Sequence, residues 1–228
     1  MMVPSSPENQ LIESAFLFRF AVPCYHCGQG WKKGGVSLPK KYMLPSFDRL
    51  DKPSPAENAW ADVRIGWSTD GIFLNLKVTG KKQPPWCRES RIEDSDGIAI
   101  WVNTRNGSQI HRASRFCHEF HFLPLGAGAN QKQPIAAQLE IRRAKEMAKI
   151  SPAHGPKSHS VLRSDGYTLS ALVPADGLTG FDPEEFPQIG FHFRVSDREL
   201  GDCSMTVGDP FPTDADPSLW SALDLIAG

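Results

Sequence analysis

Short stretches in which every second residue is apolar recur along this chain, and they constrain its fold more than any other feature of the sequence. Between Val63 and Trp67, for example, Val, Ile and Trp alternate with Arg and Gly. Successive side chains of a β-strand point to opposite faces of a sheet, so this alternation is typical of a half-buried antiparallel strand. The pattern predicts strands at residues 63–68, 72–78, 98–102, 116–123, 167–173 and 189–195.

The segments between these stretches are predicted to be turns, loops and one helix. Asp70-Gly71 is a turn dipeptide that would join the first two strands into a β-hairpin. A helix is predicted over Ala136–Ile150, where apolar residues recur at irregular spacing, and Pro152 would end it. Leu125–Pro134 and Ser151–Ser160 are predicted to be loops, the first of them mobile. We therefore expect an all-β fold, an antiparallel β-sandwich of two sheets with at most one or two short helices.

The size and charge of the chain favour one domain and argue against two classes of partner. The 228 residues include 25 Lys and Arg against 26 Asp and Glu, and a net charge of −1 is too low for a protein whose main partner is nucleic acid. The apolar run Ala15–Val22 is too short to span a membrane, and no signal peptide is visible. We expect a cytoplasmic protein with no membrane partner, in which residues 1–55 pack on or extend a sandwich formed by residues 56–228.

The cysteine and histidine residues offer weak metal-binding motifs. Cys24 and Cys27 form a lone CxxC, and a zinc ribbon would need a second such pair. His111, Cys117 and His121 could converge, whereas neighbouring residues on a strand must point to opposite faces. We expect the five cysteines to be mostly free thiols, and packing is the more common role for such residues.

Six blocks of the sequence carry a family resemblance through their order and spacing. They are ADVRIGWSTDGIFLNLKV at 61–78, DSDGIAIWVNTR at 94–105, EFHFLP at 119–124, DGYTLSALVP at 165–174, IGFHFRVSDRELG at 189–201 and DPSLWSALDL at 216–225. In these blocks the chain resembles carbohydrate-binding module family 9 and the wider group of DOMON-like β-sandwiches. The resemblance implies a sandwich of two antiparallel sheets with a saccharide-binding cleft over one of them.

The resemblance also identifies a difference at the position of the sugar. In characterised family members two tryptophans clamp a terminal sugar ring. Alignment on Asp96 places Glu93 at the first clamp position, and alignment on Gly208-Asp209-Pro210 places Val207 at the second. Neither residue is aromatic, so neither can cover the apolar face of a sugar ring. We therefore expect a non-catalytic module that resembles carbohydrate-binding modules but has an altered ligand site.

Strand parity predicts which side chains lie on the face of that cleft. If Ile98 and Ile100 face the core, the residues between and beside them face outward. The outward set from three neighbouring strands is Trp101, Glu119, His121, His192 and Arg194. A guanidinium such as that of Arg194 is suited to a planar anion, so the altered ligand is expected to be an acidic saccharide. The alternative is that these polar residues simply face solvent.

Three further residues are candidates for ligand binding. Arg112 and Arg115 precede the strand that carries His121 and could gather an acidic ligand, or they could pair with neighbouring acidic side chains. Trp86 follows Pro84-Pro85 and could be an exposed platform for a sugar or an anchor for its loop.

No cofactor is required by this interpretation, and a structural calcium ion is possible. Asp94 and Asp96 are grouped on a predicted loop, where oxygen ligands can hold calcium, and family members carry calcium at loops. The same carboxylates could instead accept hydrogen bonds from backbone N–H groups at turns.

Two other functions are weighed against saccharide binding. Glu119 and His121 could supply acid and base groups to a polysaccharide-processing enzyme, although the chain lacks GxSxG, HExxH and nucleotide-binding motifs. The same face could bind another protein, because aromatic and Arg-rich patches also serve that role.

The missing clamp generates a prediction about neutral sugars. Because Glu93 and Val207 stand at the clamp positions, glucose and cellobiose should bind weakly or not measurably in titration calorimetry. Micromolar affinity for either sugar would contradict this.

An acidic ligand should bind more weakly as salt is added and more strongly as the pH falls through about 7 to 6, where a histidine gains its charge.

Overall fold

The computed structural model of the chain describes residues 20–45, 60–107, 109–206 and 211–228. The strands in these ranges are β1 (Ala21–Tyr25), β2 (Ala61–Ser68), β3 (Gly71–Thr79), β4 (Gly97–Asn103), β5 (Cys117–Ala127), β6 (Gln133–Leu139), β7 (Lys157–Arg163), β8 (Gly166–Pro174), β9 (Gln188–Asp197), β10 (Gly201–Ser204) and β11 (Ser221–Ile226). The helical segments there are all short 3-10 turns: η1 (Lys40–Tyr42), η3 (Glu89–Asp94), η4 (Pro152–His154), η5 (Ala175–Gly177) and η6 (Pro217–Leu219). None of them is long and apolar enough to span a membrane.

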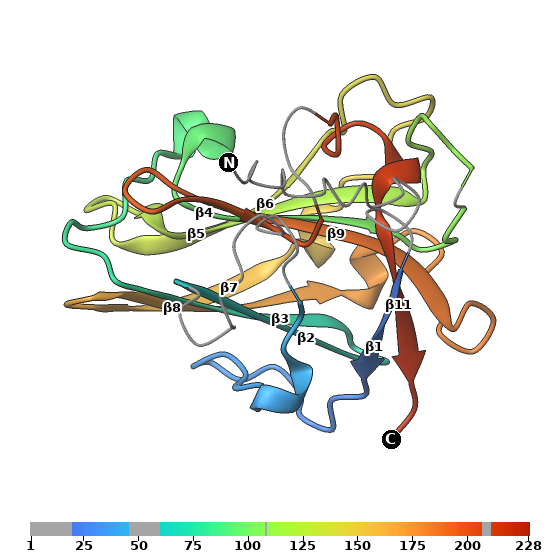
Figure 1. Cartoon of the computed structure of the whole chain (residues 1–228), viewed down its shortest axis with the longest axis horizontal. Helices are drawn as coiled ribbons and strands as arrows, with labels where there is room; N and C mark the ends of the chain where they lie inside the picture. Colours follow the sequence, from blue (N-terminus) through green and yellow to red (C-terminus); the bar gives the residue numbers. More distant parts are fainter. Residues whose placement is uncertain (1–19, 46–59, 108, 207–210) are drawn as a thin grey trace, which may run out of the picture.

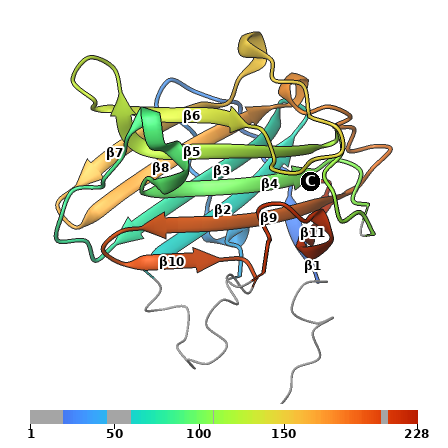
Figure 2. The same ribbon diagram turned by 90° about the horizontal axis from the view of Figure 1, so that it is seen from above.

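The strands form two sheets that face each other, as Figures 1 and 2 show. The seven-stranded sheet has the order β1-β11-β9-β4-β5-β6, with β10 also paired to β9, and the four-stranded sheet has the order β2-β3-β8-β7. Neighbouring strands are antiparallel except for the parallel pair β1 and β11. The predicted all-β sandwich of two sheets is therefore confirmed.

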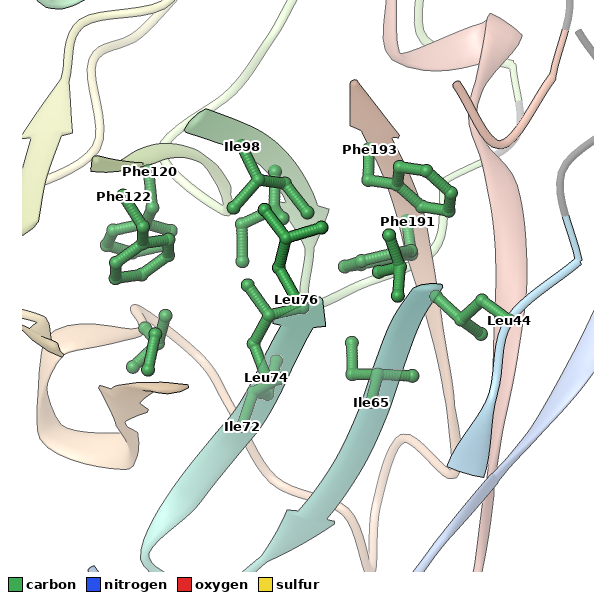
Figure 3. Close-up of a cluster of buried hydrophobic side chains, with 14 of the residues drawn as sticks. Leu44, Ile65, Ile72, Leu74, Leu76, Ile98, Phe120, Phe122, Phe191 and Phe193 are labelled. Atoms are coloured by element: carbon green, nitrogen blue, oxygen red, sulfur yellow. The ribbon is translucent and has the colours of Figure 1, made fainter. Parts of the chain in front are cut away.

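The apolar members of the alternating stretches meet between the two sheets. Figure 3 shows phenylalanines of β5 and β9 above leucines and isoleucines of β2 and β3. Phe122 and Phe193 are almost fully buried, as are Leu74 and Ile65 across from them. The six strands predicted from alternation correspond to β2, β3, β4, β5, β8 and β9, and the turn at Asp70-Gly71 joins β2 to β3 as predicted.

The predicted helix over Ala136–Ile150 is wrong. The first part of this segment belongs to β6, where Ala136 pairs with Phe122 and Gln138 pairs with Phe120 of β5. Residues 140–150 form turns without regular structure. The hydrogen-bonding edge of β5 determines this conformation, and such tertiary pairing outweighs the weak helix propensity of the segment.

Both predicted loops contain strand residues. β5 continues to Ala127 and β6 begins at Gln133, so the stretch predicted to be a mobile loop is largely a β-hairpin. Leu125 and Ala127 pack against the buried side chains of Cys87, Leu123 and Ile135, which fixes the hairpin. In the second predicted loop, β7 begins at Lys157.

The N-terminal part of the described chain contacts both sheets. β1 extends the seven-stranded sheet by pairing with β11. The segment 27–44 then crosses the outer face of the four-stranded sheet, below it in Figure 1. Val36, Leu38 and Tyr42 of this segment form a second apolar cluster with Phe73 and Leu172 of the sheet. Part of that outer face is thus covered by the chain itself.

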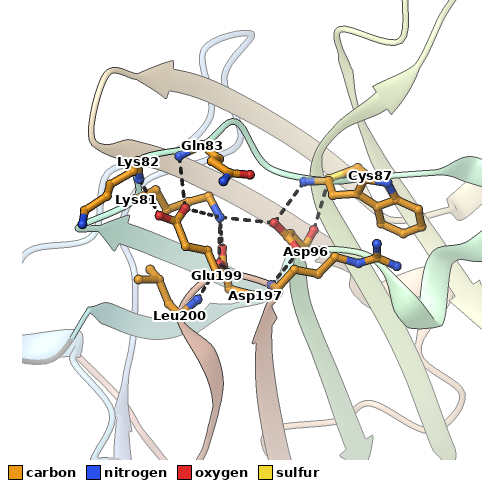
Figure 4. A network of polar contacts seen from close by, with 10 residues as sticks. Lys81, Lys82, Gln83, Cys87, Asp96, Asp197, Glu199 and Leu200 are labelled. Carbon is orange, nitrogen blue, oxygen red and sulfur yellow. Dashed lines mark hydrogen bonds and ion pairs between the residues drawn. The ribbon is translucent and has the colours of Figure 1, made fainter.

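A buried lysine joins the two sheets at one end of the sandwich (Figure 4). Lys81 follows β3, and its Nζ lies 2.6 Å and 2.7 Å from the two carboxylate oxygens of Asp197 at the end of β9. Asp96, just before β4, lies 3.3 Å from the same nitrogen, and Glu199 lies 3.7 Å from it. Burial alone would lower the pKa of Lys81, but its hydrogen bonds and charge interactions with Asp197 and Asp96 outweigh burial and raise it.

The carboxylates of this network also accept hydrogen bonds from the backbone of two connecting segments. Asp96 accepts hydrogen bonds from the N–H groups of Trp86 and Arg198, each at 3.0 Å. Asp197 accepts from the N–H groups of Glu199 and Leu200. The charge cluster therefore fixes the loop before β4 and the turn between β9 and β10, which border the site described below.

Replacement of the lysine tests the importance of the network. Lys81→Met removes the ammonium and leaves buried carboxylates without a counter-charge, so the free energy of unfolding should fall by about 3–5 kcal/mol. Urea denaturation monitored by fluorescence measures the change. Lys82→Met is the matched control, because the Lys82 side chain is exposed and only its backbone N–H contacts the network. An equal effect of the two substitutions would contradict the prediction.

Candidate functional site

The outer face of the seven-stranded sheet carries the polar residues singled out from the sequence. In Figure 2 this face is seen from above, with β5, β4 and β9 side by side. Trp101 of β4 pairs with Glu119 on one side and His192 on the other. Ala99 likewise pairs with His121 and Arg194. Strand parity thus predicted correctly that these side chains share one face.

The expectation that this face is open is wrong for most of its residues. Trp101 is 1% exposed and His192 is fully buried, and Glu119 and His121 are almost as inaccessible. Apolar side chains from three connecting segments cover Trp101, among them Ala113, Ile141 and Trp220. Trp101 consequently has no free ring face for a sugar.

Arg112 and Arg115 help to hold this cover together. The Arg112 guanidinium donates hydrogen bonds to the backbone carbonyls of Arg143 at 3.0 Å and Ala144 at 3.3 Å. Arg115 lies 3.7 Å from a carboxylate oxygen of Glu146. Both side chains therefore join the segment before β5 to the segment after β6.

Two polar contacts lie beneath the cover. His121 Nε2 and Glu119 Oε1 are 2.7 Å apart, so these two residues satisfy each other. His192 Nδ1 lies 3.4 Å from the hydroxyl of Thr206. His192 Nε2 and Trp101 Nε1 have no hydrogen-bond partner among the residues that the structure describes.

Burial decides the protonation of His192. It lowers the pKa of His192 to about 3, with the nearby positive charge of Arg194 acting in the same direction. His192 is therefore neutral between pH 6 and 7 and cannot contribute to the stronger acidic-ligand binding expected there.

The face becomes accessible at the end of the sheet near Arg194. A cleft of about 430 Å³ opens there, which we call the Arg194 cleft. Its lining is Arg91, Glu93, Asp94, Ser95, Asp96, Arg194, Ser196, Asp197, Arg198 and Asp202. A small pocket of about 10 Å³ adjoins it over Gly97 and Ala99, between His121 and Arg194. A volume of that size holds about one water molecule or one ligand oxygen.

Half of the charged side chains that line the Arg194 cleft are neutralised by an ion pair. Asp96 and Asp197 bind Lys81, and Arg91 forms an exposed pair with Asp94 at 2.6 Å. Arg194 has no carboxylate within ion-pair distance among the described residues, and its guanidinium lies 5.7 Å from the centre of the Trp101 ring. Glu93 and Asp202 likewise form no ion pair in the described ranges, although the positive charge of Arg142 interacts with Glu93 at longer range.

Trp86 anchors its loop in this structure. Its ring is half-buried, with the guanidinium of Arg198 3.3 Å from the ring centre. The backbone N–H of Trp86 donates to the carboxylate of Asp96. The face of the ring under Arg198 is not available to a sugar.

The described residues contain no group of three or more His, Cys, Asp or Glu side chains that could hold a metal ion. Of the two residues considered for calcium, Asp96 binds Lys81 and Asp94 binds Arg91. The side chains of Cys24 and Cys27 are buried in two different apolar clusters.

Of the two clamp positions, Glu93 lines the Arg194 cleft, and Val207 lies outside the described residues. Sequence reasoning did not identify Ser196 and Asp202, which also line the cleft. Strand parity could have identified Ser196, because it lies two residues after Arg194 on β9 and so shares its face. Asp202 pairs with Ser196 through β10, a strand that the alternation did not predict.

Comparison with known proteins gives similar structures only. No family model and no curated protein matches the sequence. Structures of a carbohydrate-binding module family 9 from Caldicellulosiruptor kristjanssonii, in complex with cellotriose and with glucose, match with TM-scores of 0.56 and 0.58. Each is 11% identical to this chain and covers 92% of it, with 95% and 97% of the matched chains covered.

A candidate carbohydrate-binding protein from Bacteroides uniformis ATCC 8492 matches with a TM-score of 0.52 and 13% identity, over 92% of this chain and 99% of that one. The chain therefore has the fold of carbohydrate-binding module family 9, as the sequence resemblance implied.

The buried histidines generate a prediction about acid stability. Burial lowers the pKa of His192 to about 3 and that of His118 to about 4, so the unfolded chain binds protons below pH 6.5 that the folded chain does not. Stability should therefore fall as the pH falls from 7 to 5. His192→Gln should reduce that loss by about 2 kcal/mol in urea denaturation at the two pH values.

His118→Gln offers an independent check of the same effect. In NMR spectra of the unsubstituted protein, the His192 ring signals should not move between pH 8 and pH 5. A titration of that ring near pH 6.5 would contradict the prediction.

Proposed function

We propose that this protein is a non-catalytic carbohydrate-binding module whose ligand is an acidic saccharide, bound in the Arg194 cleft. The observation that carries the proposal is the accessible guanidinium of Arg194, which has no carboxylate partner among the described residues and borders a cleft of about 430 Å³. The fold supports a saccharide ligand, because similar structures contain bound cellotriose and glucose.

The groups around the cleft match the chemistry of a uronic acid. A guanidinium offers two parallel N–H donors, the geometry that a carboxylate accepts. Glu93 and Asp202 offer carboxylate oxygens, which accept hydrogen bonds from sugar hydroxyls. Gly97 and Ala99 form a floor without bulky side chains, so a ligand oxygen can approach the sheet between His121 and Arg194.

This mode of binding differs from a clamp between two aromatic rings. The lining of the Arg194 cleft contains no Trp, Tyr or Phe. Affinity then depends on charged hydrogen bonds, which are stronger than neutral ones and are sensitive to salt. An acidic sugar supplies the charge, and a neutral sugar of the same shape does not.

Titration calorimetry with a galacturonate oligosaccharide tests the proposal. Arg194→Ala should weaken binding at least about tenfold, since one charged hydrogen-bonded pair is lost. Arg194→Lys keeps the charge but loses the paired donors, so its affinity should be intermediate. Added sodium chloride should weaken binding to the unsubstituted protein.

Arg163→Ala is the control, because Arg163 lies on the edge strand of the other sheet. Equal affinity for the galacturonate and for cellotriose, or no effect of Arg194→Ala, would contradict the acidic ligand. Loss of the fold in Arg194→Ala, checked by circular dichroism, would show that the residue is structural and would overturn the proposed site.

Two experimental outcomes would favour the alternative functions, an enzyme or a protein-interaction module. Release of products from a polysaccharide panel would favour an enzyme that uses Glu119 and His121, a pair that the cover buries in this structure. Absence of any saccharide binding, together with retention of a protein partner on Arg194, would favour an interaction module.

A further inference from the structure

A second cavity lies on the outer face of the four-stranded sheet, on the opposite side of the sandwich from the Arg194 cleft. It measures about 380 Å³. One wall is the segment Gly34–Leu38, which we call the strap, and the remaining lining comes from β2, β3, β7 and β8. Nothing in the proposed function depends on this cavity.

Strand pairing fixes the arrangement of the polar side chains in its floor. Lys77 of β3 pairs with Asp62 of β2 and with Thr168 of β8. The adjacent row of residues on the same outer face consists of Arg64 on β2, Asn75 on β3, Ser170 on β8 and His159 on β7. The floor therefore has two adjacent rows of outward residues: the second is polar across all four strands, and the first is polar on β2, β3 and β8 and ends at Val161 on β7.

The second row binds the backbone of the strap and so fixes that wall. Asn75 accepts from the Leu38 N–H at 2.6 Å and donates to the Val36 carbonyl at 2.7 Å. The Ser170 hydroxyl accepts from the Val36 N–H and also donates to its carbonyl, both at 2.9 Å.

The approach of the strap to the sheet depends on a glycine. Gly35 has a φ of +80°, and a Cβ at this position would lie 2.7 Å from Ser170 Oγ. The wall is held by these short contacts, so the cavity is part of the folded structure without a ligand.

The first row leaves one positive charge uncompensated. Asp62 and Arg64 form a two-point hydrogen-bonded pair, at 2.9 Å and 2.6 Å, and neutralise each other. Lys77 is exposed and has no carboxylate partner in the part of the chain that the structure describes. The hydroxyl of Thr168 beside it and the ring of His159 have no hydrogen-bond partner there either.

We propose that this cavity is a second ligand site, which binds a small molecule through a carboxylate group. The ammonium of Lys77 and the hydroxyl of Thr168 hold the carboxylate, and the rest of the ligand extends along the strap towards His159. A single ammonium balances one negative charge, so a monocarboxylate fits, whereas a doubly charged phosphate would place excess negative charge beside Asp62.

Titration of the ¹⁵N-labelled protein with sodium glucuronate tests the site. The Arg194→Ala variant is used for this titration so that binding in the Arg194 cleft does not contribute. The amide signals of Gly35, Thr168 and Ser170 should shift, and added salt should reduce the affinity. Adding Lys77→Met should lower the affinity at least about tenfold, because a charged hydrogen bond is lost.

Thr168→Val keeps the shape of the floor, removes the hydroxyl and should also weaken binding. Lys132→Met is the matched control, since Lys132 is an exposed lysine between β5 and β6 and does not line the cavity. Absence of shifts at the strap, or equal affinity with and without Lys77→Met, would overturn this proposal. Shifts confined to β4 and β9 of the unsubstituted protein would support the Arg194 cleft and overturn the second site.

Discussion

The buried ammonium of Lys81 is the interaction on which the arrangement at the cleft end of the sandwich depends. Lys81 leaves the four-stranded sheet after β3, whereas Asp96 and Asp197 belong to the ends of β4 and β9 in the seven-stranded sheet. Each of these ions is costly to bury alone, so each requires the others to be in place. Because the carboxylates also accept backbone N–H groups, the charge cluster determines the loop conformations that border the cleft.

The strands that were predictable from the sequence are those buried on one face by the opposite sheet. Ile189–Val195 alternates strictly because its apolar residues enter the shared core, and in Ile98–Val102 every second residue enters that core. β6 and β7 are edge strands, and their own residues carry a weaker pattern: Val161 and Leu162 of β7 are both about half exposed. What places an edge strand is the unpaired backbone of its neighbour, which no local pattern records.

The sequence predicted which side chains of the candidate site share one face of the sheet, but it did not predict whether that face is accessible. Parity placed His121 and Arg194 on one face because that depends only on position along a strand. The cover depends on contacts between distant segments, such as that between Arg112 and the Arg143 carbonyl, and these have no local signature. One signal was available in the sequence: Glu119 and His121 are two residues apart on one strand, so they can pair and be buried together.

The contact between Arg194 and Trp101 bears on the proposed ligand site, which has no aromatic residue at the two clamp positions. Arg64 and Arg91 form ion pairs with the carboxylates of Asp62 and Asp94. Arg194 instead lies over a buried indole ring, whose face attracts a cation, and it has no carboxylate partner among the described residues. In the proposed site this tryptophan would position a cation for the ligand, whereas a clamp tryptophan would contact the sugar itself. The proposed site would lack the affinity of ring stacking and would depend on the ligand's charge, and this dependence is the reason for proposing an acidic saccharide over a neutral one.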